Sequence, residues 1–136
     1  MGERVLVPVD GSESAWSALE YAVEHHQSGE LTVLHVVDPM RGDYYGDEEA
    51  GSPVSRSEEL LAEAQERLAE TPDGLDVETT SVTGKPADAI LDYAETNDFD
   101  QIVMGSRGRS GLSRLLLGSV AETVVRRSSG PVTVVR

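Results

Sequence analysis

The chain has 136 residues and no stretch typical of a linker, so we expect one domain spanning residues 1–136. It contains no cysteine, which excludes disulfides and thiolate metal sites. With 25 acidic and 11 basic residues, the net charge is -14, which argues against nucleic-acid and membrane partners. Lys85 is the only lysine, and this acidic, lysine-poor composition suggests a salt-rich cytoplasm; an ordinary acidic cytoplasmic protein is the alternative.

The first half of the chain alternates between strand and helix patterns. Arg4–Val9 is rich in β-branched residues and predicts a buried strand, after which Ser12 or Ser14 can cap a helix. That helix is indicated by apolar residues at three- and four-residue spacing: Ala15, Ala18, Leu19, Ala22 and Val23. Leu31–Val37 predicts a second strand. Residues 38–53 are rich in Gly, Asp and Glu without any period, which predicts a long, mobile loop.

The second half continues this alternation. Glu58–Glu70 predicts a helix with a favourable Glu63–Arg67 pair on its exposed side, and Leu75–Val82 alternates as a half-buried edge strand does. Pro86 suits the first position of a third helix, whose apolar residues are Ala87, Ile90, Leu91 and Ala94. A central strand, a loop rich in Gly and Arg, a fourth helix and a last strand follow: Asp100–Met104, Gly105–Leu117, the segment opened by Ser119, and Pro131–Val135.

This order of elements predicts an α/β fold, in which helices cover both faces of a parallel sheet. Ligands of such sheets bind beyond the carboxyl ends of the strands, where the strand order reverses. The ends of the first and fourth strands carry Asp10-Gly11-Ser12 and Gly105-Ser106-Arg107-Gly108. We therefore expect a binding site between these two segments.

The loop after the fourth strand has the composition of a phosphate site. Gly105, Gly108 and Gly118 let the backbone approach a phosphate, and Ser119 stands at a helix start that favours an anion. From residue 101 to 121 there is no acidic residue, but there are three arginines: Arg107, Arg109 and Arg114. The pattern is neither a Walker A loop nor a dinucleotide fingerprint.

Two alternatives need no ligand in this loop. Ser119 and Glu122 form an S-x-x-E capping box, which explains the serine by itself, although a capped helix start still presents backbone N–H groups. The alternative for the basic stretch is a solvated loop that is basic by chance.

Asp10 could act as a catalytic base, but a carboxylate beside a ribose is favoured. His35, alone in a strand, is interpreted as structural, and Trp16 as covering the sheet or an interface.

Motifs along essentially the whole chain resemble the universal stress protein family. They are V-L-V-P-V-D-G-S-E-S from Val5, L-H-V-V-D from Leu34, G-K-P-A-D-A-I from Gly84, D-Q-I-V-M-G-S-R-G from Asp100, L-L-L-G-S-V-A-E-T-V-V from Leu115 and P-V-T-V-V from Pro131. The G-x2-G-x9-G-S/T spacing is the mark of the nucleotide-binding branch. The resemblance implies an open five-stranded parallel sheet in the order 3-2-1-4-5, Rossmann-like and similar to adenine nucleotide alpha hydrolases.

The resemblance also implies binding of ATP, or of ADP or AMP, with Mg²⁺ on the phosphates as an option, although few protein ligands for a metal are evident. It implies a stress-response regulator with little or no turnover. By motif position, the implied contacts are Pro8, Val9 and Asp10 at the adenosine, Val36 at the adenine edge, Met104, Gly105, Arg107 and Gly108 at the ribose and phosphates, and Gly118, Ser119 and Val120 at the phosphate tail.

The family dimerises through its last strand, which implies a homodimer through Val132–Val135; a covered edge is the alternative. Two other functions remain open. One is a slow ATPase or self-phosphorylating protein that uses Ser110, Ser113 or Ser119, and the other is a chaperone-like dimer without nucleotide. The glycine spacing argues against the latter, and the lack of an obvious base, Walker lysine or acidic metal pair argues against efficient turnover.

Overall fold

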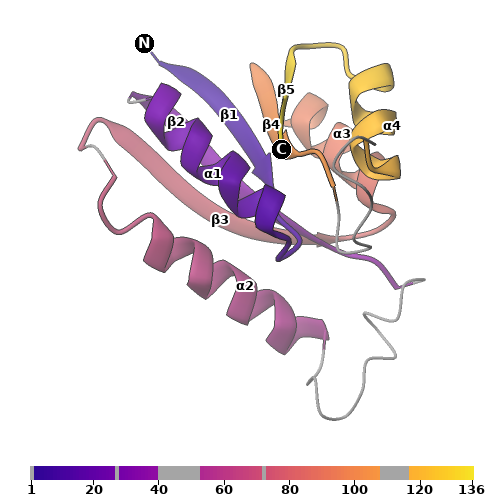
Figure 1. The fold of residues 1–136 in the computed structure, drawn as a ribbon, viewed down its shortest axis with the longest axis horizontal. Coiled ribbons are helices and arrows are strands. Elements are labelled where there is room, and N and C mark those ends of the chain that lie inside the picture. The colour runs from indigo at the N-terminus through magenta and orange to yellow at the C-terminus, as the bar shows by residue number, and fades with distance from the viewer. Residues whose placement is uncertain (1, 27, 40–52, 72, 108–116) are drawn as a thin grey trace.

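The computed structural model describes the chain except for residues 1, 27, 40–52, 72 and 108–116. Five parallel strands form one sheet in the order β3-β2-β1-β4-β5, as the family resemblance implied. The strands are β1 Glu3–Pro8, β2 Gly29–Val37, β3 Leu75–Thr83, β4 Gln101–Gly105 and β5 Val132–Val135. The helices are α1 Glu13–His25, α2 Pro53–Arg67, α3 Pro86–Thr96 and α4 Ser119–Arg127 (Figure 1).

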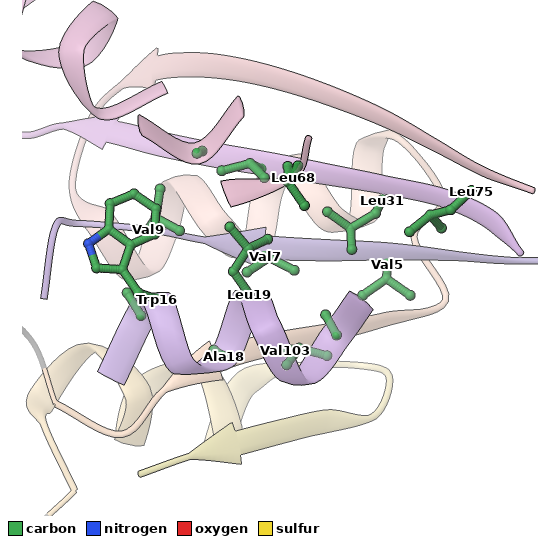
Figure 2. Close-up of a cluster of buried hydrophobic side chains, with 14 residues drawn as sticks. Val5, Val7, Val9, Trp16, Ala18, Leu19, Leu31, Leu68, Leu75 and Val103 are labelled. Atoms are coloured by element: carbon green, nitrogen blue, oxygen red, sulfur yellow. The ribbon is translucent and has the colours of Figure 1, made fainter. Parts of the chain in front are cut away.

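Two hydrophobic clusters, one on each face of the sheet, hold the helices in place. Along the central strand β1, Val5 and Val7 pack with α1 and α2, whereas Leu6 packs with α3 and α4. This alternation follows from the two-residue period of a strand, and it explains why β1 is apolar on both faces. Figure 2 shows the first cluster, in which Leu19 of α1 faces β1 and Trp16 lies beside Val9.

Trp16 is only 7% exposed and belongs to the buried core. The sequence left two roles open for this side chain, covering the sheet or an interface. Its burial between α1, the sheet and α2 supports the first role.

Helix starts and ends follow the local chemistry of the sequence. Ser12 caps α1, since its Oγ accepts a hydrogen bond from the Ala15 N–H at 3.2 Å. Helix α3 begins at Pro86 as predicted. The helix predicted at residues 58–70 instead spans Pro53–Arg67 as α2, and its start agrees with the preference of proline for a first helical position.

The sequence predictions for the two long loops fall largely on residues that the structure does not describe. Of the loop at 38–53, residues 40–52 lie outside the described part, and of the loop at 105–117, residues 108–116 do. The predicted pair on α2 is confirmed, with Arg67 Nη2 donating to Glu63 Oε1 at 3.2 Å. No helix in the described ranges is both long and apolar enough to span a membrane.

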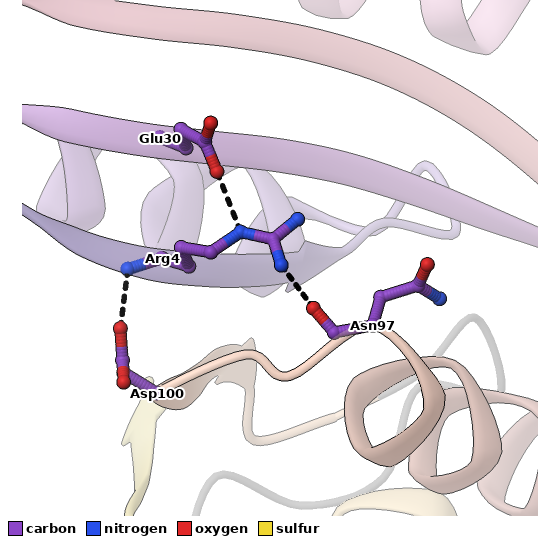
Figure 3. A network of polar contacts seen from close by, with 4 residues as sticks. All are labelled: Arg4, Glu30, Asn97 and Asp100. Carbon is purple, nitrogen blue, oxygen red and sulfur yellow. Dashed lines mark hydrogen bonds and ion pairs between the residues drawn. The ribbon is translucent and has the colours of Figure 1, made fainter.

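Arg4 ties together the amino ends of the strands, opposite the edge where the site is expected. Its backbone N–H donates to Asp100 Oδ2 at 2.7 Å, and its Nε donates to Glu30 Oε2 at 2.5 Å (Figure 3). The guanidinium also donates to the backbone carbonyl of Asn97 and lies 4.7 Å from the ring centroid of Phe99. One side chain thus joins β1, β2 and the segment that leads into β4.

Candidate functional site

A cavity of about 330 Å³ lies at the carboxyl edge of the sheet. Strands β1 and β4 are neighbours in the sheet, and their connections leave toward opposite faces, so the cavity occupies the point where the strand order reverses. Its walls come from the ends of β1, β2 and β4 and from the first turns of α1, α3 and α4. Fold and cavity together agree with the location expected from the sequence.

Every predicted site residue except Gly108 lines this one cavity. Gly108 lies outside the described residues. The others are Pro8, Val9, Asp10, Val36, Met104, Gly105, Arg107, Gly118, Ser119 and Val120. These residues range from position 8 to position 120 of the sequence. They lie together because parallel strands end at the same edge of the sheet.

The cavity wall divides into an apolar part and a polar part. Leu34, Val36, Ile90 and Met104 provide apolar side chains from β2, α3 and β4. The polar lining residues include Asp10, Arg107 and Ser119, which carry a carboxylate, a guanidinium and a hydroxyl. A recess that combines an apolar wall with a few convergent polar groups has the usual character of a small-molecule site.

Asp10 is held by its own turn at the end of β1. Its Oδ1 accepts a hydrogen bond from the Ser12 N–H at 2.9 Å, which is the pattern of an Asx-turn. The side chain is half-buried and lines the cavity. The turn therefore restricts the carboxylate to the wall of the cavity before any ligand arrives.

The start of α4 corrects one sequence prediction. Gly118 is the N-cap residue, with φ -66° and ψ 158°, and Ser119 is the first helical residue, so Ser119 and Glu122 do not form a capping box. Glu122 instead accepts a hydrogen bond from Arg126 Nη2 at 2.8 Å. Because glycine has no side chain with which to cap, the first N–H groups of α4 receive no side-chain cap from their N-cap residue. Such a helix start is suited to bind an anion.

Several residues for which the sequence predicted no contact with a ligand also line the cavity. His35 is 4% exposed, and its Nδ1 lies 2.7 Å from Ser57 Oγ on α2, which agrees with the structural role expected for it. It nevertheless reaches the cavity wall, as does the buried Asp38. Both residues lie within two positions of Val36 in the sequence, and this proximity to the end of β2 is the signal that could have predicted them.

The described residues contain no group of three or more His, Asp or Glu side chains that could hold a metal ion. Oxygen donors at the cavity wall are instead spread over separate elements. Asp10 follows β1, Asp38 follows β2 and Ser119 begins α4.

The fold and the cavity define an α/β protein with a candidate ligand site at the switch point of a doubly wound sheet. The model of the "Universal stress protein family" matches residues 1–136, and the chain belongs to that family. Universal stress protein MJ0531 of Methanocaldococcus jannaschii is 35% identical, over 98% of this chain and 82% of the relative.

Solved structures agree with this assignment. The structure of MJ0577, a universal stress protein of the same organism, has a TM-score of 0.82 and 33% identity, and the match covers 99% of this chain and 96% of that one. A universal stress protein in complex with cAMP has a TM-score of 0.75 and 28% identity, covering 99% and 97% of the two chains.

Proposed function

We propose that this protein binds an adenine nucleotide in the cavity between the carboxyl ends of β1 and β4, and that nucleotide occupancy regulates a stress response with little or no turnover. The observation that carries the proposal is the convergence of Asp10, Gly105, Arg107 and Gly118 on one cavity. A related structure, the universal stress protein in complex with cAMP, supports an adenine-containing ligand.

In this proposal the two parts of the cavity bind two parts of the nucleotide. The adenine lies among the apolar side chains, near Val36 and Met104, and the ribose lies beside Asp10. The phosphates lie near Arg107 and the uncapped start of α4. A protein of net charge -14 needs such a local concentration of positive charge to hold a polyphosphate.

ATP is the proposed ligand, with ADP and AMP as the alternatives of the same class. Mg²⁺, where it is bound, would be held mainly by phosphate oxygens and water, as this ion usually is. Little turnover is expected because no described residue has been identified as a base for the attacking water. Slow hydrolysis, self-phosphorylation and a nucleotide-free assembly are outcomes that experiment can separate.

The direct test is calorimetric titration of the pure protein with ATP, ADP and AMP at high salt, with and without Mg²⁺. We expect saturable binding of at least one of these nucleotides. No binding of any of them would contradict the proposal and favour the nucleotide-free assembly. Steady phosphate release at rates typical of enzymes would instead identify an ATPase.

A matched pair of variants tests where the phosphates lie. The backbone of Gly118 has φ -66°, which any residue adopts, so Gly118→Val adds a side chain at the cavity wall without backbone strain. We expect it to abolish nucleotide binding while leaving the circular dichroism spectrum unchanged. Gly130→Val, at an exposed bend outside the cavity, is the control. Unchanged affinity in Gly118→Val would show that the phosphates bind elsewhere.

We further propose a homodimer through β5, which is an edge strand with half-exposed valines. In a parallel strand both backbone groups of a residue point the same way, and the Val135 carbonyl accepts from Ser106 toward β4. The backbone groups of Val134 therefore face outward. Val134→Pro should dissociate the dimer in analytical ultracentrifugation; a monomeric wild type at tens of micromolar would contradict the proposal.

A further inference from the structure

The hydroxyl of Ser14 holds both backbone groups of Arg107. Ser14 Oγ donates to the Arg107 carbonyl at 2.8 Å and accepts from the Arg107 N–H at 3.3 Å. Ser14 is 2% exposed, in the first turn of α1, and 93 residues separate it from its partner. The Ser12 hydroxyl adds a longer hydrogen bond of 3.3 Å to the same carbonyl.

Close packing between α1 and the end of β4 makes this contact possible. A Cβ added to Gly105 would lie 2.5 Å from Ser14 Oγ and 2.7 Å from the Ala15 backbone nitrogen. Glycine is therefore required at this position, because any side chain would push the helix start away from the strand. The Ser14 hydroxyl is thus fixed by its surroundings before it contacts Arg107.

Arg107 is held by its backbone at the wall of the site. Arg107 lines the cavity, whereas Ser14 is not among the described residues that do. On the other side of the same strand end, the Gly118 N–H donates to the Ser106 carbonyl at 2.7 Å. The Ser14 hydroxyl therefore fixes the backbone of Arg107, and the carbonyl of the preceding residue, Ser106, fixes Gly118.

We propose that Ser14 is a positioning residue for the phosphate end of the site, acting through the backbone of Arg107. This inference rests on the proposed nucleotide function. An arginine whose backbone is already held loses less freedom when it engages a phosphate, so binding is stronger. Without the Ser14 hydroxyl, the Arg107 carbonyl loses a hydrogen-bond donor and the Arg107 N–H loses its acceptor. The backbone that carries the guanidinium is then less restricted.

The test compares Ser14→Ala with the wild type for two ligands, ATP and adenosine. Because Arg107 is assigned to the phosphates, we expect the affinity for ATP to fall about tenfold while that for adenosine changes less than about twofold. Ser17→Ala is the matched control, since it is the same substitution one turn further along α1 and should leave both affinities unchanged. Circular dichroism and melting of the free protein check the fold.

Each outcome of this test has a definite meaning. A selective loss for ATP supports the positioning role, because general loosening of the protein would weaken adenosine as well. Equal losses for both ligands, or no loss, overturn it. If the wild type binds neither ligand, the proposed function itself fails. Should Ser14→Ala not fold, Ser14→Cys takes its place with the same expectation, since a thiol is a weak hydrogen-bond donor.

Discussion

The guanidinium of Arg67 lies over the indole ring of Trp16, with its central carbon 4.6 Å from the ring centroid. Arg67 is the last residue of α2, and Trp16 belongs to α1, so the contact joins the two helices that cover one face of the sheet. The same guanidinium reaches Glu63 Oε1 at 3.2 Å and Glu20 Oε1 at 3.7 Å. It thus combines a cation–π contact with two ion pairs.

Replacing Arg67 by alanine should destabilise the protein by about 1 kcal/mol, because the cation–π contact and the partly exposed ion pairs are each of modest strength. Arg67→Lys should recover only part of this loss, since an ammonium cannot stack as a planar guanidinium does. Urea unfolding measures the change. Arg126→Ala, which removes an exposed pair with Glu122 on α4, is the control and should change stability by less than about 0.5 kcal/mol. Equal effects in the two alanine variants would contradict a special role for the indole contact.

Gly105→Ala should destabilise the protein by about 1–3 kcal/mol, because its methyl group would meet backbone that cannot move aside. The nearest atoms are Ser14 Oγ at 2.5 Å and the Ala15 nitrogen at 2.7 Å. Gly130→Ala is the control, since its added Cβ would lie 3.5 Å from the Asp100 carbonyl oxygen, an ordinary contact. Thermal melting compares the two variants. A neutral Gly105→Ala would mean that α1 is not packed tightly against β4 in solution.

Sequence patterns were sufficient for the arrangement of elements, because each strand and helix has its own local signal. The continuous apolar run of β1 and the alternation of β3 follow from their central and edge positions in the sheet. The strand order came from the family resemblance, since local patterns do not state which strands pair. The boundaries of α2 were wrong, because the amphipathic pattern was followed only from residue 58 to 70 and the start at Pro53 was missed.

Predicting the site required contacts that no local pattern contains. Asp10 and Gly105 could be placed together because both follow strands that end at one edge of the sheet. The bond from Ser14 to Arg107 could not be predicted, because it depends on how closely α1 packs against β4. The capping box at Ser119 failed for a related reason: a sequence match to S-x-x-E does not determine whether the helix begins at the serine or one residue earlier.

Ser106→Ala should leave the protein equally stable or stabilise it by up to about 1 kcal/mol. The Ser106 hydroxyl is buried and has no hydrogen-bond partner among the residues that the structure describes. Its backbone bonds to Val135 and Gly118 do not depend on the side chain. Urea unfolding of the free protein measures the change, with Ser57→Ala, which removes the buried bond to His35, as the destabilised comparison. A loss above about 1 kcal/mol in Ser106→Ala would reveal a partner for this hydroxyl.

Asp10→Ala should weaken ATP and adenosine by a similar factor of about ten, because the proposed partner of the carboxylate is a ribose hydroxyl that both ligands carry. This pattern differs from the phosphate-selective loss expected for Ser14→Ala. The wild type should also prefer ATP over 2′-deoxyATP if Asp10 accepts from the 2′-hydroxyl, and Asp10→Ala should lose that preference. Asp10 also accepts from the Ser12 N–H at 2.9 Å, so Asp10→Asn, which keeps an acceptor oxygen for this turn, is the matched variant for the loss of charge alone. Calorimetric titration of the three ligands against both variants gives the affinities. A loss confined to ATP in Asp10→Ala would place this carboxylate near the phosphates and overturn the ribose assignment.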